Sequence, residues 1–420
     1  MLLPAAALIE VAERFGTPTY VTDIAELRRC AERVRRAFPD PWLRQYSLKA
    51  NDVPAIVAET AACGFGPNVV SRGEWALAAE ARLSNDRISL EGVGKTDADL
   101  DAAVRAVHRG APLRWVSIES LDELAAFQRI ALEAGVLSAA AIDVLFRVNP
   151  GVEPETTAGL AVGHASSKFG MTADELARAI AALETGSPLR LVGLHLHVGS
   201  QLAAVNAWQA AVRHALDLFA QWQPRVPTLT TLDVGGGFPS GVPGAPEPAD
   251  FARAFDQAIT GIARDRRPTV MAIEPGRFLT ATAGSIVATV LHVRSGRLKA
   301  GEPLVVIDAG MTELIRPALY GARHPIVALT SMGRPVAAGG AERDTTVEGP
   351  ICESTDQLGR HRLPPLQRGD LVAILEAGAY ASSMSSRYNG RPRPAEVLIE
   401  PDGRLRLGRP RGHAGIWQQA

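Results

Sequence analysis

Four short stretches of the sequence carry side chains that could act together in catalysis. Lys49 ends an apolar run in YSLKAN, His197 lies in HVGSQ, a glycine triplet spans 235–237, and Glu274 opens EPGR. A lysine amine becomes nucleophilic when a desolvated pocket keeps it neutral, so Lys49 is a candidate for Schiff-base chemistry. Because a lysine at a strand end is more often only a solvated charge, the other three stretches decide between the two interpretations.

These stretches favour a cofactor with a phosphate and a basic ring. Glycines let backbone N–H groups approach a phosphate closely, although a triplet alone is a weak signal. A carboxylate such as Glu274 beside a phosphate site requires a cation, and the protonated ring nitrogen of pyridoxal phosphate (PLP) is one. We then expect His197 to stack on the cofactor. The plainer interpretations are an ion pair between Glu274 and Arg277 and a core histidine.

The elements that would position these groups form a regular alternation. Apolar, strand-like runs alternate with Ala-rich amphipathic stretches from about residue 46 to 275, which indicates βα units and a parallel sheet. Eight such units match a (β/α)8 barrel, whose active site forms at the carboxyl ends of the strands. The predicted strand runs are 46–50, 66–71, 87–92, 114–120, 142–150, 190–200, 231–238 and 269–276. Lys49, His197, the triplet and Glu274 follow the first, sixth, seventh and eighth of them.

The sequence pattern changes after residue 280. Strand-like runs there follow one another with turn residues between them, at 284–296, 303–310, 344–353, 370–380 and 395–408. This pattern predicts a separate, mostly antiparallel β domain, which the strand-like stretch 17–23 is expected to join. We therefore predict an α/β protein whose barrel spans 25–277 and whose β domain combines 1–24 with 278–420.

Composition limits the classes of partner. The 420 residues carry a net charge of −1, with 46% hydrophobic and 21% charged residues, as in ordinary globular proteins. This balance gives no electrostatic reason to expect nucleic acid or an anionic membrane as a partner. Cys30, Cys63 and Cys352 have neither metal-ligand spacing nor a disulfide pattern, so we expect no metal site. The start lacks a basic signal-peptide region and no apolar run approaches a membrane span, so we expect a cytoplasmic protein.

At this point the motifs show a resemblance. The chain resembles the fold-type III, alanine-racemase-like PLP decarboxylases, and within them it is most similar to the diaminopimelate decarboxylases. The resemblance covers nearly the whole chain, and its motifs occur in the order of that family. They are YSLKAN (46–51), HVGSQ (197–201), DVGGGF (233–238), EPGR (274–277), DAGMTELIRPALYGARHPI (308–326), GPICESTD (349–356) and GAYASSMSSRYNGRPRPAEVL (378–398).

The resemblance implies a role for each matching residue. Lys49 would form the Schiff base with PLP, Cys352 would return a proton to the substrate carbon, and His197 would assist at the ring. Because the family takes this cysteine from a second subunit, a homodimer with shared active sites is expected. The residues implied to hold the cofactor are Lys49, His197, Ser200, Gly236, Gly237, Glu274, Pro275, Gly276, Arg277 and Tyr380.

Charge indicates the kind of substrate. Arg277 and Arg316 are suited to carboxylates, Tyr320 lies one helical turn after Arg316, and Glu353 could pair with an ammonium group. Each of them alone could be a surface ion pair. Together with Tyr380, they suit an amino acid with a distal carboxylate and amine, and they argue against ornithine as substrate. The expected reaction is decarboxylation of meso-2,6-diaminopimelate to L-lysine and carbon dioxide, a step of lysine biosynthesis.

Some residues depart from the family pattern and leave alternatives open. Asn68 stands where the family usually has an acidic residue, Arg72 and Trp75 are unusual in the same motif, and the loop 156–165 lacks the usual His-Pro-Tyr run. The runner-up is a related decarboxylase acting on another carboxylate-bearing amino acid, such as a siderophore precursor or a carrier-bound glutamyl group. A racemase and a non-catalytic cofactor-binding protein are less consistent with Cys352 and the long β domain.

Overall fold

The computed structural model describes residues 4–183, 186–295, 302–336 and 341–412. The chain divides into two compact units, one of Ala31–Phe278 and one of Met1–Cys30 with Leu279–Ala420. The domain limits expected from the sequence, 25–277 and 1–24 with 278–420, stay a prediction.

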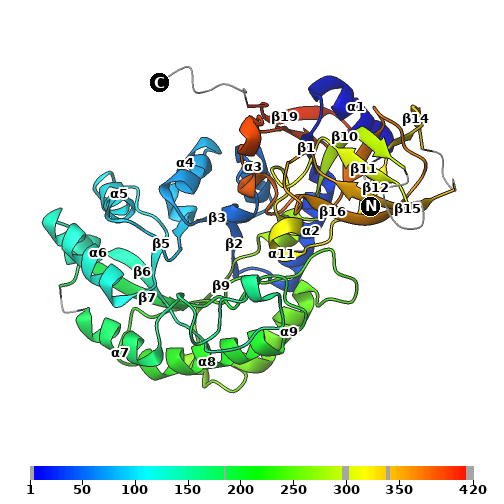
Figure 1. The fold of residues 1–420 in the computed structure, drawn as a ribbon. Coiled ribbons are helices and arrows are strands. Elements are labelled where there is room, and N and C mark those ends of the chain that lie inside the picture. Colours follow the sequence, from blue (N-terminus) through cyan, green and yellow to red (C-terminus); the bar gives the residue numbers. More distant parts are fainter. Residues whose placement is uncertain (1–3, 184–185, 296–301, 337–340, 413–420) are drawn as a thin grey trace. The chain divides into compact units, whose positions relative to one another are not determined.

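The unit Ala31–Phe278 contains a closed barrel of parallel strands (Figure 1). Each predicted strand run contains or overlaps one of them, so the predicted (β/α)8 barrel is confirmed. The parallel strands are largely buried because helices cover the outside, and all four residues of β5, WVSI, are buried. The strands are β2 (Leu43–Ser47), β3 (Gly66–Val69), β4 (Ser89–Leu90), β5 (Trp115–Ile118), β6 (Ile142–Arg147), β7 (Leu189–His195), β8 (Thr231–Asp233) and β9 (Val270–Ile273).

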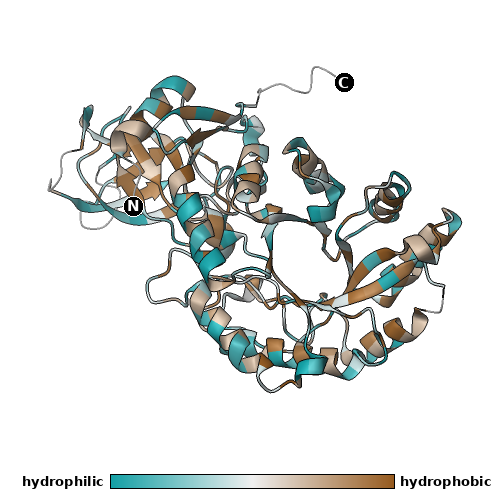
Figure 2. Ribbon diagram, turned by 180° about the vertical axis from the view of Figure 1, so that it is seen from behind, coloured by the Kyte–Doolittle hydropathy of each residue, from teal (hydrophilic) through white to brown (hydrophobic). Residues whose placement is uncertain are grey.

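Several helices around the barrel are amphipathic, and several are capped by side chains. Figure 2 shows both hydrophilic and hydrophobic residues along them. In α8 the buried residues Trp208, Ala211, Val212, Ala215, Leu216 and Phe219 recur at helical spacing. Capping boxes formed by Thr96 with Asp99 and by Thr172 with Glu175 begin α5 and α7. The helices are α2 (Ile24–Ala37), α3 (Pro54–Ala62), α4 (Arg72–Glu80), α5 (Asp97–His108), α6 (Leu121–Glu133), α7 (Ala173–Ala182), α8 (Asn206–Trp222), α9 (Pro248–Ile259) and α10 (Arg277–Thr280).

The second unit is built on a mostly antiparallel sheet, which confirms the predicted second architecture. Its strand order is β16-β15-β11-β10-β1-β18-β19, and β17 pairs with both β10 and β12. The stretch 17–23 joins this sheet as β1, antiparallel to β10 and parallel to β18. The main elements are α1 (Ala5–Phe15), β1 (Thr19–Asp23), β10 (Gly284–Arg294), β11 (Leu304–Ile307), α11 (Arg316–Tyr320), β12 (Ile326–Ala328), β15 (Arg343–Glu348), β16 (Gln357–Leu363), β17 (Leu371–Ile374), β18 (Ala395–Ile399) and β19 (Leu405–Arg409). A short hairpin of β13 (Thr330–Ser331) and β14 (Arg334–Pro335) stands apart.

Two strands of this sheet, β12 and β16, were not predicted. β16, QLGRHRL, carries three basic side chains and pairs only along β15, at the end of the strand order. Charged residues are common on edge strands because they discourage pairing with other chains. The same charges conceal the apolar alternation by which a strand is recognised in a sequence.

Within the described residues, no helix combines the length and apolar character needed to cross a membrane. Cys30 is buried, Cys63 is half-buried and Cys352 is exposed, and none of the three forms a disulfide.

Candidate active site

Lys49 lies in a short 3-10 turn, Leu48–Ala50, directly after β2. Leu48 and Ala50 are buried and anchor the turn on both sides of the lysine. Ser47 fixes the end of β2 to the loop after β9, because its backbone N–H donates to Pro275 O at 3.2 Å and its hydroxyl donates to Glu274 O at 3.3 Å. The first strand and the eighth therefore present Lys49 and Glu274 at the same end of the barrel.

Gly276 makes this close approach possible. A Cβ at this position would lie 3.0 Å from Ser47 Cβ and 3.1 Å from Ala50 Cβ, which is tighter than ordinary packing. Any side chain at residue 276 would push the loop that follows β9 away from the turn that carries Lys49. The glycine of EPGR is thus explained by contact with the lysine turn.

The glycine triplet is a turn packed between two neighbouring strand ends. Gly235 and Gly237 have φ values of 68° and 106°, in the region that favours glycine. A Cβ at Gly235 would overlap the carbonyl oxygen of Leu196, and one at Gly236 would overlap that of Glu274. The backbone of the triplet therefore packs closely against neighbouring loops at the same end of the barrel, without side chains of its own.

His197 lies two residues beyond the end of β7. Its Nδ1 accepts a hydrogen bond from Gly236 N at 3.1 Å, which ties the ring to the glycine turn. Desolvation, followed by the positive charges of Lys49 and Arg147, lowers the pKa of His197 well below its ordinary value. The ring is therefore neutral, and its Nδ1 is an acceptor.

Arg277 and Ser200 form another contact at this end of the barrel. Arg277 Nε donates to the Ser200 hydroxyl at 3.0 Å. The divergent loop packs on the same segment, because Thr156 Oγ1 donates to Ser200 O at 2.6 Å and Ala161 forms a β-bridge with Gly199. This divergent loop therefore contacts a predicted cofactor residue, Ser200.

The departures next to β3 differ in what they contact. Asn68 Nδ2 donates to Glu274 Oε1 at 2.5 Å, so Asn68 belongs to the site. Arg72 Nε donates to Asp99 at 2.9 Å, and Trp75 Nε1 donates to Asn85 at 2.9 Å. Arg72 and Trp75 thus bond to residues outside the predicted site.

Sequence reasoning missed a buried pair beside Glu274. The ring of His195, at the end of β7, lies between the carboxylates of Glu91 and Glu274. The sequence LHLH (194–197) contained a signal for His195. Alternate residues of a strand face the same side, so His195 could be expected on the side of His197, which was already a candidate. The sequence contained no such signal for Glu91.

Glu74 was also missed in the sequence. Burial raises the pKa of its carboxyl. The hydrogen bond that Glu74 accepts from the Val70 N–H and the charge of Lys49 oppose this rise.

The other predicted residues lie in the second unit. Arg316 begins α11 and is buried, with its guanidinium carbon 5.7 Å from the centre of the Tyr320 ring.

Cys352 and Glu353 are exposed, and Tyr380 adopts a positive φ of 57°. Asn389 Nδ2 lies 3.4 Å from Cys352 Sγ, and the Tyr388 hydroxyl donates to Glu353 at 2.7 Å. Asn389 and Tyr388 were not singled out in the sequence.

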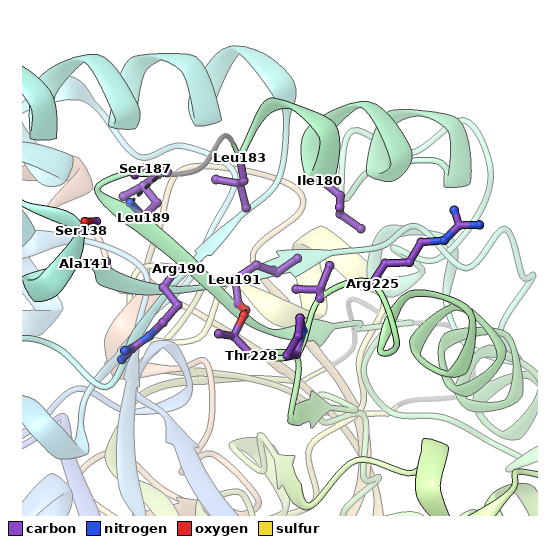
Figure 3. A pocket seen from close by; sticks show the side chains of 13 residues that line it. Ser138, Ala141, Ile180, Leu183, Ser187, Leu189, Arg190, Leu191, Arg225 and Thr228 are labelled. Carbon is purple, nitrogen blue, oxygen red and sulfur yellow. Dashed lines mark hydrogen bonds between the residues drawn. The ribbon is translucent and has the colours of Figure 1, made fainter.

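A cavity of about 360 Å³ opens elsewhere on the barrel (Figure 3). Its lining includes Ala141, Leu189 and Thr228, which lie at or just before the starts of β6, β7 and β8. Parallel barrels carry their chemistry at the opposite, carboxyl ends of the strands. This cavity is therefore separate from the site around Lys49.

Comparisons with known proteins agree with this geometry. Residues 24–281 match the model of the family described as pyridoxal-dependent decarboxylase, pyridoxal binding domain. A diaminopimelate decarboxylase of Aquifex aeolicus is 34% identical over 98% of this chain and 93% of its own length, and one of Deinococcus radiodurans is 37% identical over 95% and 94%. The crystal structure of diaminopimelate decarboxylase from Helicobacter pylori complexed with L-lysine superposes with a TM-score of 0.87 at 28% identity, covering 98% of both chains.

Proposed function

Because this chain belongs to the pyridoxal-dependent decarboxylase family, we propose that it converts meso-2,6-diaminopimelate into L-lysine and carbon dioxide. The chain is thus a PLP-dependent carboxy-lyase. One observation carries the proposal: Ser47 joins the turn that bears Lys49 to the loop that bears Glu274. The chain that contains this contact matches diaminopimelate decarboxylases over nearly its full length. The L-lysine in the related crystal structure supports the choice of product.

The residues at the strand ends fit PLP. Gly237, in the close-packed glycine turn, would offer its backbone N–H to a phosphate, together with Gly276, Arg277 and Ser200. Glu274 is a buried carboxylate suited to a protonated ring nitrogen, and Lys49 supplies the amine for the aldehyde carbon. Neutral His197 suits the face of a flat ring. When bound, PLP supplies a sink for the electrons that the departing carboxylate leaves behind.

We assign proton return to Cys352. Its exposed thiol would give a proton from Sγ to the carbon that has lost its carboxylate, and Asn389 holds the sulfur at 3.4 Å. Arg277, Arg316, Tyr320, Glu353 and Tyr380 would bind the distal amino-acid head, with Glu353 held by the Tyr388 hydroxyl.

We further propose a homodimer in which one subunit supplies Cys352 to the barrel of the other, as the resemblance implies. The exposure of Cys352 and Glu353 leaves both side chains accessible to a second copy. The three cysteines, none of which forms a disulfide, support a place in the cytoplasm.

A substrate panel tests the proposal. The purified protein, reconstituted with PLP, is incubated separately with meso-2,6-diaminopimelate, L-lysine, L-ornithine, L-glutamate and L-arginine, and carbon dioxide is measured. We expect release from diaminopimelate at a kcat/KM at least about a hundredfold above that for the other substrates. Equal or faster release from another amino acid would refute the substrate and leave the reaction class intact. Racemisation without carbon dioxide would refute the reaction class.

One observation favours a second kind of substrate, which the panel therefore includes. The divergent loop 156–165 contacts the Ser200 segment through Thr156 and Ala161. A loop in that position could reshape the substrate entrance, and a larger substrate such as a carrier-bound glutamyl group would then be preferred. Including such a substrate in the panel separates the two functions directly.

A further inference from the structure

A row of three ionisable side chains crosses the interior of the barrel behind the site. Glu91 follows β4, His195 ends β7 and Glu274 follows β9. His195 Nδ1 lies 3.1 Å from Glu91 Oε2, and His195 Nε2 lies 3.6 Å from Glu274 Oε1, with side-chain exposures of 2% for the histidine and 5% for each glutamate. Removing such groups from water is costly unless their charges compensate one another.

The histidine carries a positive charge in this row. Burial by itself would lower the pKa of His195, but the carboxylates of Glu91 and then of Glu274 raise it to about 10. Burial would likewise raise the pKa of Glu91, but the charge of His195 and its hydrogen bond lower it to about 2. Glu91 and His195 therefore form an ion pair across the neutral pH range.

The surrounding groups add hydrogen bonds without adding net charge. Trp115 Nε1 donates to Glu91 Oε1 at 3.1 Å, Ser117 Oγ lies 3.0 Å from His195 Nδ1, and Asn68 Nδ2 donates to Glu274 Oε1 at 2.5 Å. The next acid, Asp233, is buried, and burial followed by the charge of Glu274 raises the pKa of its carboxyl well above the ordinary value. This shift favours the neutral form of Asp233.

Two of the nearby cations are engaged by other acids. Arg147 Nη1 donates to Glu119 at 2.8 Å, and Lys95 Nζ lies 2.9 Å from Glu123. Among these described groups, the row of Glu91, His195 and Glu274 thus carries two negative charges and one positive charge. One more positive charge at Glu274 would balance this row.

We propose that Glu91 and His195 are positioning residues that reserve the charge of Glu274 for the protonated ring nitrogen of PLP. The inference rests on the proposed function and deepens it. Glu91 balances His195, so Glu274 is held by the donor from Asn68, with His195 Nε2 3.6 Å away, while its negative charge stays available. Charges then alternate along the row from Glu91 to the cofactor ring.

Glu91 has a specific role, although His195 lies between it and Glu274, the carboxylate that would meet the cofactor. Without Glu91, the positive charge on His195 would have only Glu274 as its partner. Glu274 would then be neutralised by the histidine, either as an ion pair or by taking its proton. In both cases the attraction for a protonated ring nitrogen weakens, whereas contacts to the phosphate and the ring face do not change.

The test compares PLP with its carbocyclic analogue, in which carbon replaces the ring nitrogen. Equilibrium binding of both is measured to the cofactor-free full chain and to its Glu91→Gln variant, so the readout does not depend on turnover. We expect Glu91→Gln to weaken PLP binding by about tenfold or more, equal to about 1.4 kcal/mol, and to change binding of the analogue less than about twofold. Ser117→Ala is the matched control, because it removes a neutral neighbour of His195 and is expected to leave the ratio of the two affinities unchanged.

Equal weakening of both ligands by Glu91→Gln, or a change in the ratio with Ser117→Ala, would overturn the inference and show a merely structural role. If Glu91→Gln does not fold, His195→Gln is measured in the same way, and NMR titration of His195 in the wild-type chain must show it charged at pH 8. A zinc ion found on Glu91, His195 and Glu274, whose ligand atoms lie within 4.8 Å of one another, would also overturn it. The proposed function fails separately, through the substrate panel with the wild-type protein.

Discussion

Replacing both members of the buried pair, Glu91→Gln together with His195→Gln, isolates the charge of the pair from its shape. A Gln–Gln pair keeps similar volumes and hydrogen-bonding groups but does not titrate. Replacing a buried ion pair as a whole is often close to neutral for stability, so the absolute difference from wild type is not the diagnostic quantity. The diagnostic quantity is how that difference changes with pH.

The pKa values set the size and sign of this change. The pKa of His195 is raised to about 10 when folded, against about 6.5 when unfolded. Its contribution is therefore fully present below about pH 6.5 and is lost as the pH rises through about 10. By linkage this contribution falls by about 3 kcal/mol between pH 6 and pH 9. The pKa of Glu91, lowered to about 2, loses its contribution only as the pH falls below about 4.5, and it reports the same interaction, so the two are not added.

The assay is urea unfolding of wild type and of the double variant at several pH values from 6 to 9. Tryptophan fluorescence is suitable because Trp42, Trp75, Trp115, Trp208 and Trp222 lie in the barrel unit. We expect the free energy of unfolding of wild type, relative to the variant, to fall by about 3 kcal/mol over this range. A difference that stays constant from pH 6 to 9 would refute a charged His195. Ser117→Ala, which keeps both charges, should retain the pH dependence of wild type.

Three further predictions concern the cofactor and the proton donor. Lys49→Ala should abolish the borohydride-sensitive absorption of the purified protein and lower kcat by at least about 10³-fold; full activity in this variant would disprove the role of the lysine amine. Gly236→Ala places a methyl group against the carbonyl oxygen of Glu274, a backbone atom that cannot rotate away, so we expect PLP affinity to fall at least about tenfold. Gly94→Ala, where a Cβ meets nothing within 4 Å, should bind PLP as wild type does, and similar losses in both variants would contradict the packing argument. Cys352→Ala should slow lysine release by about 10²- to 10⁴-fold or place the proton on the wrong carbon, as mass spectrometry of products formed in D2O would reveal; unchanged rates and products would exclude the thiol as donor.

The fold was accessible from the sequence because its signals are local. Alternation of buried strands and amphipathic helices is visible within windows of a few residues, and it predicted each barrel strand. The rule that parallel barrels act at the carboxyl ends of their strands then selected Lys49, His197 and Glu274 from many charged residues. β16 was missed because its charges conceal the strand pattern.

The reasons for individual site residues were less accessible. The glycine triplet and Gly276 were interpreted through a phosphate, whereas the structure shows an additional cause in the close approach of strand ends. Asn68 was noted only as a departure from a pattern, and its hydrogen bond to Glu274 could not be foreseen. Such contacts join strands that are far apart in the chain, and a sequence gives no distance between them.

By itself, the sequence determined the barrel, the β domain and the candidacy of Lys49 and Glu274, because periodicity and strand-end position are properties of neighbouring residues. Only the tertiary structure decided the state of charge around Glu274. Glu91 and His195 come from β4 and β7, and closure of the barrel brings them into contact inside a medium that excludes water. Burial and proximity together fix the protonation of these groups, and both arise only when the strands have assembled.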